Sequence, residues 1–165
     1  MASGRKRILV VDNDEAVCRM VEAILADRDY AVSAYTRSLD AMAGFAPGKH
    51  DLVITDIKMP IMNGLDVLQK VKQQDPAVPV IMITAHATVD LSIQALRQGA
   101  YDFLTKPFEP EELLSRIRNA LRQTELIKEN RELKEELAAW QGSIVGDSPH
   151  LLNLLETARK VAIRD

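Results

Sequence analysis

Five short apolar runs alternate along the chain with segments whose apolar residues recur at helical spacing. The runs lie at about residues 7–12, 30–35, 51–55, 80–83 and 100–104. Their length and their β-branched composition are typical of strands that are buried on both faces. Because parallel strands must be joined by crossovers, the alternation predicts an α/β fold with a doubly wound, five-stranded parallel sheet.

Four helices are predicted between these runs, each with a local signal near one end. They begin near Asp14, Ser38, Leu65 and Thr88. Ser38 is expected to cap the second helix, because a serine oxygen can accept a hydrogen bond from a free backbone N–H. Gly99 is expected to end the fourth helix, because glycine readily adopts the left-handed conformation found there.

The last predicted helix is much longer than the others. Residues 110–141 contain no glycine and no proline after the first position, and Glu, Leu, Arg, Lys, Asn and Ala dominate. This composition predicts a continuous helix, which Gly142 is expected to end. Its first half carries enough leucine and isoleucine to pack on the sheet. A first domain is therefore expected over residues 1–121, with the helix continuing beyond it as a linker.

The second half of this helix carries a coiled-coil pattern. Spacings of four and three residues separate Leu126, Asn130, Leu133, Leu137 and Trp140. Such a seam predicts a parallel homodimer, and a single asparagine within it favours two strands in one register. Two alternatives remain open at this point, because only about two heptads fit. The helix could be a solvated single helix, or it could lie on another domain.

Another pattern begins after the linker, over residues 142–165. Ser148 and Pro149 are suited to the cap and the first position of a helix, and an apolar helical pattern follows them. A helix this apolar is expected to be the start of a second domain.

Composition and charge narrow the classes of function. In 165 residues, the hydrophobic content of 47% is ample for a core, and the aromatic content of 4% makes that core aliphatic. A net charge of −3 gives no electrostatic footprint for direct contact with nucleic acid or with an anionic membrane. No long apolar stretch or signal peptide is evident, so a cytoplasmic protein is expected. The single Cys18 excludes an internal disulfide.

Four polar residues follow the predicted strands at the ends where function is expected. Asp12, Asp56, Thr84 and Lys106 each close or follow an apolar run. The carboxyl ends of parallel strands meet at one edge of the sheet, where open α/β folds place their sites. Two acids suit Mg²⁺, and a hydroxyl and an ammonium suit the oxygens of a phosphoryl group. Singly, each residue is more often a cap, a turn residue or a surface charge; together they favour a phospho-accepting site.

At these residues the sequence resembles the receiver domain of bacterial two-component response regulators. The resemblance covers about residues 7–121 and rests on ILVVDND (8–14), DIKMP (56–60), NG (63–64), ITA (83–85) and KPF (106–108). It implies a flavodoxin-like fold in which Asp56 accepts phosphate from a sensor histidine kinase with Mg²⁺ bound. It also implies that the backbone carbonyl of Lys58 is a metal ligand, and that Thr84 and Phe103 form a switch pair.

One residue departs from the family pattern. The second of two adjacent acids after the first strand is normally a metal ligand, and here it is Asn13. An asparagine oxygen can still bind the metal, but the site loses one negative charge. We therefore expect weaker Mg²⁺ binding, and we do not expect Asp14 to compensate, because it begins a helix.

The linker and the segment after it resemble a particular subclass. A long helix followed by IVGDSP (144–149) looks like the junction to the AAA+ ATPase domain of NtrC-class, sigma-54-dependent activators. In a longer parent protein this implies an AAA+ ring, sigma-54 RNA polymerase and DNA as partners. No glycine-rich phosphate loop ending in Lys-Ser or Lys-Thr is present in this sequence, so the chain is expected to be a regulatory domain and not an enzyme.

Two other functions are compatible with parts of the sequence. A receiver that is not phosphorylated could act only as a dimerisation and docking module, with Asn13 as the sign of a decayed metal site. A flavodoxin-like nucleotide-binding enzyme would need a Gly-, Ser- or Thr-rich loop after the first strand. The loop here is the acidic stretch 12–15, which would repel a phosphate unless a cation intervened.

Overall fold

The computed structural model describes residues 4–146, which fall into two compact units that divide after Thr124. The first unit contains a parallel sheet in the order β2-β1-β3-β4-β5. Its strands are β1 (Arg7–Val11), β2 (Ala31–Tyr35), β3 (Leu52–Asp56), β4 (Val80–Thr84) and β5 (Asp102–Thr105). The predicted doubly wound, five-stranded sheet is therefore confirmed.

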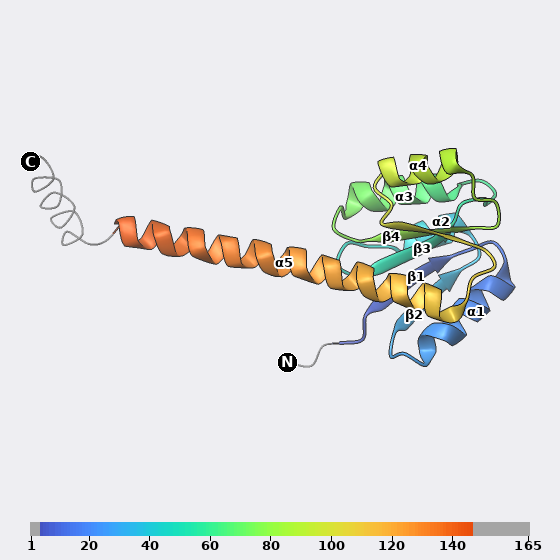
Figure 1. The fold of residues 1–165 in the computed structure, drawn as a ribbon, viewed down its shortest axis with the longest axis horizontal. Coiled ribbons are helices and arrows are strands. Elements are labelled where there is room, and N and C mark those ends of the chain that lie inside the picture. The colour runs from blue at the N-terminus through green and yellow to red at the C-terminus, as the bar shows by residue number, and fades with distance from the viewer. Residues whose placement is uncertain (1–3, 147–165) are drawn as a thin grey trace, which may run out of the picture. The chain divides into compact units, whose positions relative to one another are not determined.

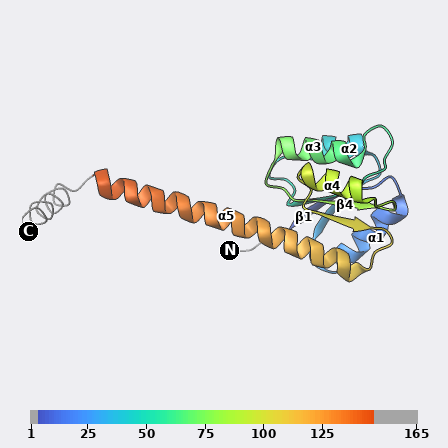
Figure 2. The same ribbon diagram turned by 45° about the horizontal axis from the view of Figure 1, so that its top comes forward.

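Helices cover both faces of this sheet (Figures 1 and 2). They are α1 (Glu15–Ala26), α2 (Ser38–Gly44), α3 (Gly64–Gln74), α4 (Val89–Arg97) and α5 (Pro110–Gly146). One face is packed by α2, α3 and α4, and the other by α1 and the first turns of α5. Because both faces are covered, the central strands carry consecutive apolar residues along most of their length instead of alternating apolar and polar ones.

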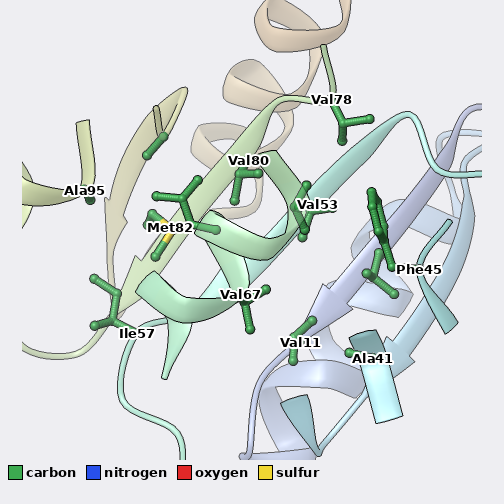
Figure 3. Packing of buried hydrophobic residues seen from close by; sticks show 14 of the residues in the cluster. Val11, Ala41, Phe45, Val53, Ile57, Val67, Val78, Val80, Met82 and Ala95 are labelled. Atoms are coloured by element: carbon green, nitrogen blue, oxygen red, sulfur yellow. The ribbon is translucent and has the colours of Figure 1, made fainter. Parts of the chain in front are cut away.

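The two faces bury two separate aliphatic clusters. On the face of α3, Val67 packs with Val11, Val53 and Val80 from three strands (Figure 3). On the opposite face, the leucines and isoleucine of the first turns of α5 pack against α1 and the sheet. Burial of these side chains supplies most of the stabilisation, at roughly 25 cal/mol per Å² of apolar surface. The sheet is thus a rigid platform for the residues at its edge.

The ends of the helices test the predicted caps. Gly99 follows α4 with φ +97, so its predicted role in ending that helix is confirmed. The Ser38 prediction was wrong: Ser38 is the first, buried residue of α2, and Arg37 is the N-cap without a side-chain hydrogen bond. The Gly142 prediction was also wrong, because α5 continues to Gly146. A glycine inside a helix costs only about 1 kcal/mol relative to alanine, so one does not have to end a helix.

The second unit begins at Glu125, and its described part is the remainder of α5. The predicted start of another domain lies, from residue 147 onward, outside the described residues. Among the described residues, no helix has the length and apolar character needed to cross a membrane.

A buried histidine makes the stability of the first unit dependent on pH. His50 is 3% exposed, its ring stacks on Phe45 at 5.7 Å, and its Nδ1 has no hydrogen-bond partner. Burial lowers the pKa of His50, the charges of Lys49 and Arg7 lower it further, and Asp51 opposes them. The folded state therefore binds a proton at His50 less readily than the unfolded chain, in which the histidine is protonated below its ordinary pKa of about 6.5.

We expect this histidine to weaken the fold in acid. Since the unfolded state binds the extra proton, the free energy of unfolding falls as pH drops below about 6.5, by up to about 1.4 kcal/mol per pH unit. Urea unfolding between pH 7.5 and 5.5 should therefore show a steeper loss for the natural protein than for His50→Gln. The exposed His86 offers a control, since His86→Gln should keep the natural slope. Equal slopes for His50→Gln and the natural protein would show that burial of His50 does not cause the loss.

Candidate functional site

The four predicted site residues lie at the carboxyl-terminal edge of the sheet. Asp56 and Thr84 are the last residues of β3 and β4, while Asp12 and Lys106 directly follow β1 and β5. These strands are parallel neighbours, with Thr84 in register with Thr105. The sheet therefore brings together residues that are up to 94 positions apart in sequence.

An ammonium group joins the two carboxylates of this site. The Lys106 Nζ lies 2.5 Å from Oδ2 of Asp12 and 3.3 Å from Oδ1 of Asp56. The side chains of Asp12 and Asp56 are 1% and 7% exposed, and that of Lys106 is 18% exposed. Buried charges are tolerated only when they are paired, so each acid depends on this lysine for neutralisation.

The backbone holds Lys106 against the neighbouring strand. Its N–H donates to the carbonyl of Thr84 at 2.8 Å, which continues the pairing of β4 and β5 past the last strand residue. This hydrogen bond fixes the backbone position from which the ammonium extends, while the flexible stem leaves the ammonium able to move between nearby acceptors. The Lys106-Pro107 peptide bond is cis.

Burial and charge shift the pKa values of Asp56 and Lys106 in the same direction. Burial raises the pKa of the Asp56 carboxyl; Lys106 lowers it and Asp12 raises it again, with a net rise. For Lys106, burial on its own lowers the pKa, but the hydrogen bonds and charges of Asp12 and Asp56 together outweigh it and raise the pKa. Lys106 therefore stays charged, and the ionised form of Asp56 is energetically costly.

The arrangement of these oxygens fits a divalent cation. Two buried carboxylates already converge on one positive charge, and carboxylate and carbonyl oxygens are the ligands that Mg²⁺ prefers. Asp14 is not available as a third acid, because its side chain caps α1 by accepting from the N–H of Ala16 at 2.9 Å. Among the described residues, no three His, Cys, Asp or Glu side chains gather in a metal-binding group.

The remaining predicted residues lie near this edge of the sheet, but within the described residues none of them forms a hydrogen bond to Asp56. The Thr84 hydroxyl accepts from the N–H of His86 at 3.3 Å, within its own loop. Phe103 is half-buried and packs against the apolar cluster on the side of α4. Asn13 and Lys58 are exposed in the loops after β1 and β3.

Sequence reasoning missed the role of a glycine beneath the loop that follows β3. Gly64, the first residue of α3, donates its N–H to the carbonyl of Ile57 at 2.9 Å. A Cβ at Gly64 would lie 2.1 Å from the carbonyl oxygen of Asp56, so only glycine allows this approach. The capping box of Asn63 and Asp66 was the available signal, since it places the helix start at this point.

Comparison with known proteins gives a family match over most of the first unit. The model for the response regulator receiver domain matches residues 8–118. This interval includes all five strands, apart from the first residue of β1, and the four residues at the edge of the sheet.

Individual relatives match different shares of this chain. DctD of Rhizobium meliloti (strain 1021), a C4-dicarboxylate transport transcriptional regulatory protein, is 32% identical over 165 residues, which cover 99% of this chain and 36% of DctD. NtrX from Brucella abortus, solved in complex with ADP, superposes with a TM-score of 0.74 at 32% identity, covering 78% of this chain and 30% of NtrX. A beryllofluoride-activated NtrC4 receiver domain dimer superposes with a TM-score of 0.68 at 31% identity, covering 72% and 98% of the two chains. The chain thus spans about a third of the length of such regulators as DctD.

Proposed function

Because this chain belongs to the response regulator receiver domain family, we propose that Asp56 accepts a phosphoryl group from a sensor histidine kinase. The observation that carries the proposal is the single ammonium of Lys106 between the carboxylates of Asp12 and Asp56. It supports a site in which two negative charges lie close together and the positively charged side chain of Lys106 lies beside them. Phosphoryl transfer depends mostly on positioning and charge neutralisation, which is what these residues supply.

The transfer step places the new charge at Asp56. A carboxylate oxygen of Asp56 forms a bond to phosphorus as the bond from phosphorus to the donor's histidine nitrogen breaks, and that nitrogen keeps the electron pair. The ammonium of Lys106, which its raised pKa keeps protonated, then moves toward the new negative charge and contacts a phosphoryl oxygen. Asp12 loses one partner in this exchange, so a second cation is needed beside it.

Mg²⁺ is the cofactor that fits this need. Asp12, Asp56, the side-chain oxygen of Asn13 and the backbone carbonyl of Lys58 would hold it, with water completing the shell. When bound, the ion neutralises charge on the phosphoryl oxygens. Because Lys106 already occupies the space between the two acids, the metal and the ammonium compete for Asp12.

Substituting Asn13 tests the metal set directly. Restoring an acid by Asn13→Asp should tighten Mg²⁺ binding about tenfold, since one more negative charge lies beside the cation. Isothermal titration calorimetry without a phosphoryl donor measures this affinity. Asn119→Asp adds the same charge on the exposed side of α5 and should leave the affinity unchanged. Equal Mg²⁺ affinities for Asn13→Asp and the natural protein would refute the role of residue 13.

Phosphorylation switches the domain through Thr84 and Phe103. The added group carries about −1.5 to −2 charges, and its oxygens can accept the proton of the Thr84 hydroxyl, whose oxygen accepts from the N–H of His86 before phosphorylation. When the hydroxyl turns toward the phosphoryl group, the half-buried ring of Phe103 can fill the space that is left. This movement repacks the surface of α4, β5 and α5.

The output of this switch is a change in the homodimer and its linker. Leu126, Leu133, Leu137 and Trp140 are exposed on α5, and with Asn130 they form the proposed dimer seam. The NtrC4 receiver dimer supports association of such domains. In a longer parent protein, the linker would control an AAA+ domain that acts with sigma-54 RNA polymerase on DNA; the ATPase chemistry would belong to that domain.

The experiment that tests the function uses acetyl phosphate as the donor. The chain is incubated with acetyl phosphate, with and without Mg²⁺, and intact mass is measured together with light scattering. A single phosphoryl adduct that requires Mg²⁺ and changes the association of the chain is expected. The exposed Asn13 in place of an acid favours a second candidate, a docking module that is not phosphorylated. A stable dimer without adduct and without response to Mg²⁺ would establish that second function instead.

A further inference from the structure

The two edge strands of the sheet, β2 and β5, differ in how their edges are protected. On β5 the N–H of Phe103 donates to Oδ1 of its neighbour Asp102 at 2.7 Å, and Oδ2 of Asp102 pairs with Arg116. Charged side chains of this kind prevent a further strand from pairing with an exposed edge. The opposite edge strand, β2, has no charged residue and no proline over residues 30–36. The edge of β2 therefore lacks the protection that β5 has.

The hydrogen bonds between β2 and β1 show which residues of β2 face into the sheet. At one end of β2, the N–H of Ala31 donates to the carbonyl of Lys6 at 2.9 Å. At the other end, the carbonyl of Tyr35 accepts from the N–H of Asp12 at 3.1 Å. Since the direction of the backbone groups alternates along a strand, the odd-numbered residues of β2 all face β1.

The even-numbered residues, Val32 and Ala34, therefore direct their backbone groups away from the sheet. Each presents one N–H and one C=O at the edge, and within residues 4–146 no hydrogen bond to these groups is formed. A row of unpaired donors and acceptors is the surface on which another strand can be added.

From this edge we infer that β2 of one copy of the chain pairs antiparallel with β2 of a second copy, with the two-fold axis at Ser33. In this register Val32 of each copy exchanges both of its backbone hydrogen bonds with Ala34 of the other, so all the outward groups are satisfied. The same surface is used on both copies, as a two-fold contact between identical chains requires. The two sheets then join into one.

The side chains of β2 fit this register. On the face of α1 and α5, Val32 would lie opposite the small side chain of Ala34 of the second copy. On the other face, Tyr35 would lie opposite Ala31 of the second copy. The two Ser33 hydroxyls would meet at the axis, where they can bond to each other. Each large side chain therefore faces a small one.

Charges beyond the two ends of β2 favour the antiparallel direction. Asp29 lies two residues before the strand and Arg37 two residues after it, and both are exposed. Antiparallel pairing about Ser33 brings Asp29 of each copy toward Arg37 of the other, whereas parallel pairing in register would bring like charges together. Their present ion pairs, with Arg5 and Asp40, are exposed and therefore weak, so both charges remain able to take a partner from the second copy.

This contact is separate from the site, from the switch and from the linker. It involves neither Asp56 nor the pair Thr84 and Phe103, and β2 lies at the opposite edge of the sheet from β5. It therefore goes beyond the proposed function. Together with the homodimer proposed above, it would join pairs of copies into larger assemblies.

Cysteine crosslinking tests the register. Ser33→Cys and the control Ala31→Cys are made separately in a chain that carries Cys18→Ala, so that each chain has one thiol. At the axis, the two Cα atoms of residue 33 would lie about 4.5 Å apart, which a disulfide can span. Residue 31 would lie four positions from its own copy, roughly 13 Å away. Mild oxidation should therefore link two copies of Ser33→Cys and leave Ala31→Cys unlinked; equal linking of the two variants, or none, would overturn the register.

Removing an outward donor tests the hydrogen bonds. Ala34→Pro lacks the N–H, but the pairing of β2 with β1 does not use that group, so the domain should still fold and form the acetyl phosphate adduct. Half of the hydrogen bonds between the copies would be lost, so the dissociation constant should rise about tenfold or more. The control Ala34→Ser keeps the N–H and should change the dissociation constant little.

These constants are measured by sedimentation equilibrium of the whole chain with Leu133→Lys, which removes the proposed linker seam from the measurement. Equal dissociation constants for Ala34→Pro and Ala34→Ser, or a chain that is monomeric at every concentration, would overturn the pairing of β2. If Ala34→Pro failed to fold, the comparison of Ser33→Cys with Ala31→Cys would decide the inference alone.

Discussion

Replacing Asp56 by Asn is expected to abolish phosphoryl transfer from acetyl phosphate while leaving the domain more stable than before. An amide has no nucleophilic carboxylate oxygen, so no acyl phosphate can form at this position. Intact mass after incubation with acetyl phosphate and Mg²⁺ should show the adduct in the natural chain and none in Asp56→Asn. The matched variant Asp40→Asn removes an exposed carboxylate on α2 and should keep the adduct.

The gain in stability has its origin in the buried charge. Burial, followed by the charge of Asp12, raises the pKa of Asp56 even though Lys106 opposes them. A carboxyl with a raised pKa binds its proton more tightly in the folded state, so stability rises as pH falls and the ionised form costs stability near pH 7. Removing this charge should raise the free energy of unfolding by about 1 kcal/mol, because Asp12 still pairs with Lys106.

Urea unfolding at neutral pH measures this gain. Asp40→Asn should change the free energy of unfolding by less than about 0.5 kcal/mol. An adduct that persists in Asp56→Asn would place the acceptor elsewhere. A loss of both the adduct and the fold would instead mean that the Asp56 carboxylate is needed to hold the structure together, and that its charge is not a net cost to stability.

Substituting Gly64 by Ala should be among the most destabilising single changes in the domain. The new Cβ would lie 2.1 Å from the carbonyl oxygen of Asp56 and 2.8 Å from Cα of Ile57, both of them backbone atoms that cannot swing aside. We expect the free energy of unfolding to fall by about 3 kcal/mol, since overpacking forces the backbone to move. Displacement of the acceptor loop should also slow formation of the adduct.

A second glycine on a helix provides the control. A Cβ at Gly44, the last residue of α2, would meet the hydroxyl of Tyr35 at 2.4 Å, which is the far end of a side chain that can turn away. Because alanine is the better helix former, Gly44→Ala should be near neutral in urea unfolding and should keep the normal rate of adduct formation. If Gly64→Ala were as mild as Gly44→Ala, the close approach beneath Asp56 would have no consequence for the fold.

The order of the residues was sufficient to predict the sheet and the edge at which the site lies. Apolar runs followed by a polar residue predicted both the strands and the edge where their ends meet, because a parallel sheet places such ends side by side. The polar residues in question are Asp12, Asp56, Thr84 and Lys106. Local signals were less dependable at helix ends. Ser38 resembled a cap but is buried, and Gly142 resembled a stop but is helical, since packing and neighbouring helical residues outweigh a weak local preference.

The distances between the site's side chains and the burial of individual groups were decided only by the tertiary structure. The 2.5 Å and 3.3 Å contacts of Lys106 with Asp12 and Asp56 depend on strand register, which no local pattern specifies. The clearance at Gly64 and the unpartnered Nδ1 of His50 likewise depend on what packs against them. Local periodicity reflects the secondary structure of a segment, whereas pKa shifts and steric limits arise between segments far apart in sequence. For this protein, the residue order was enough to predict which polar groups meet at the edge of the sheet, and three-dimensional packing set their charge balance and their room to move.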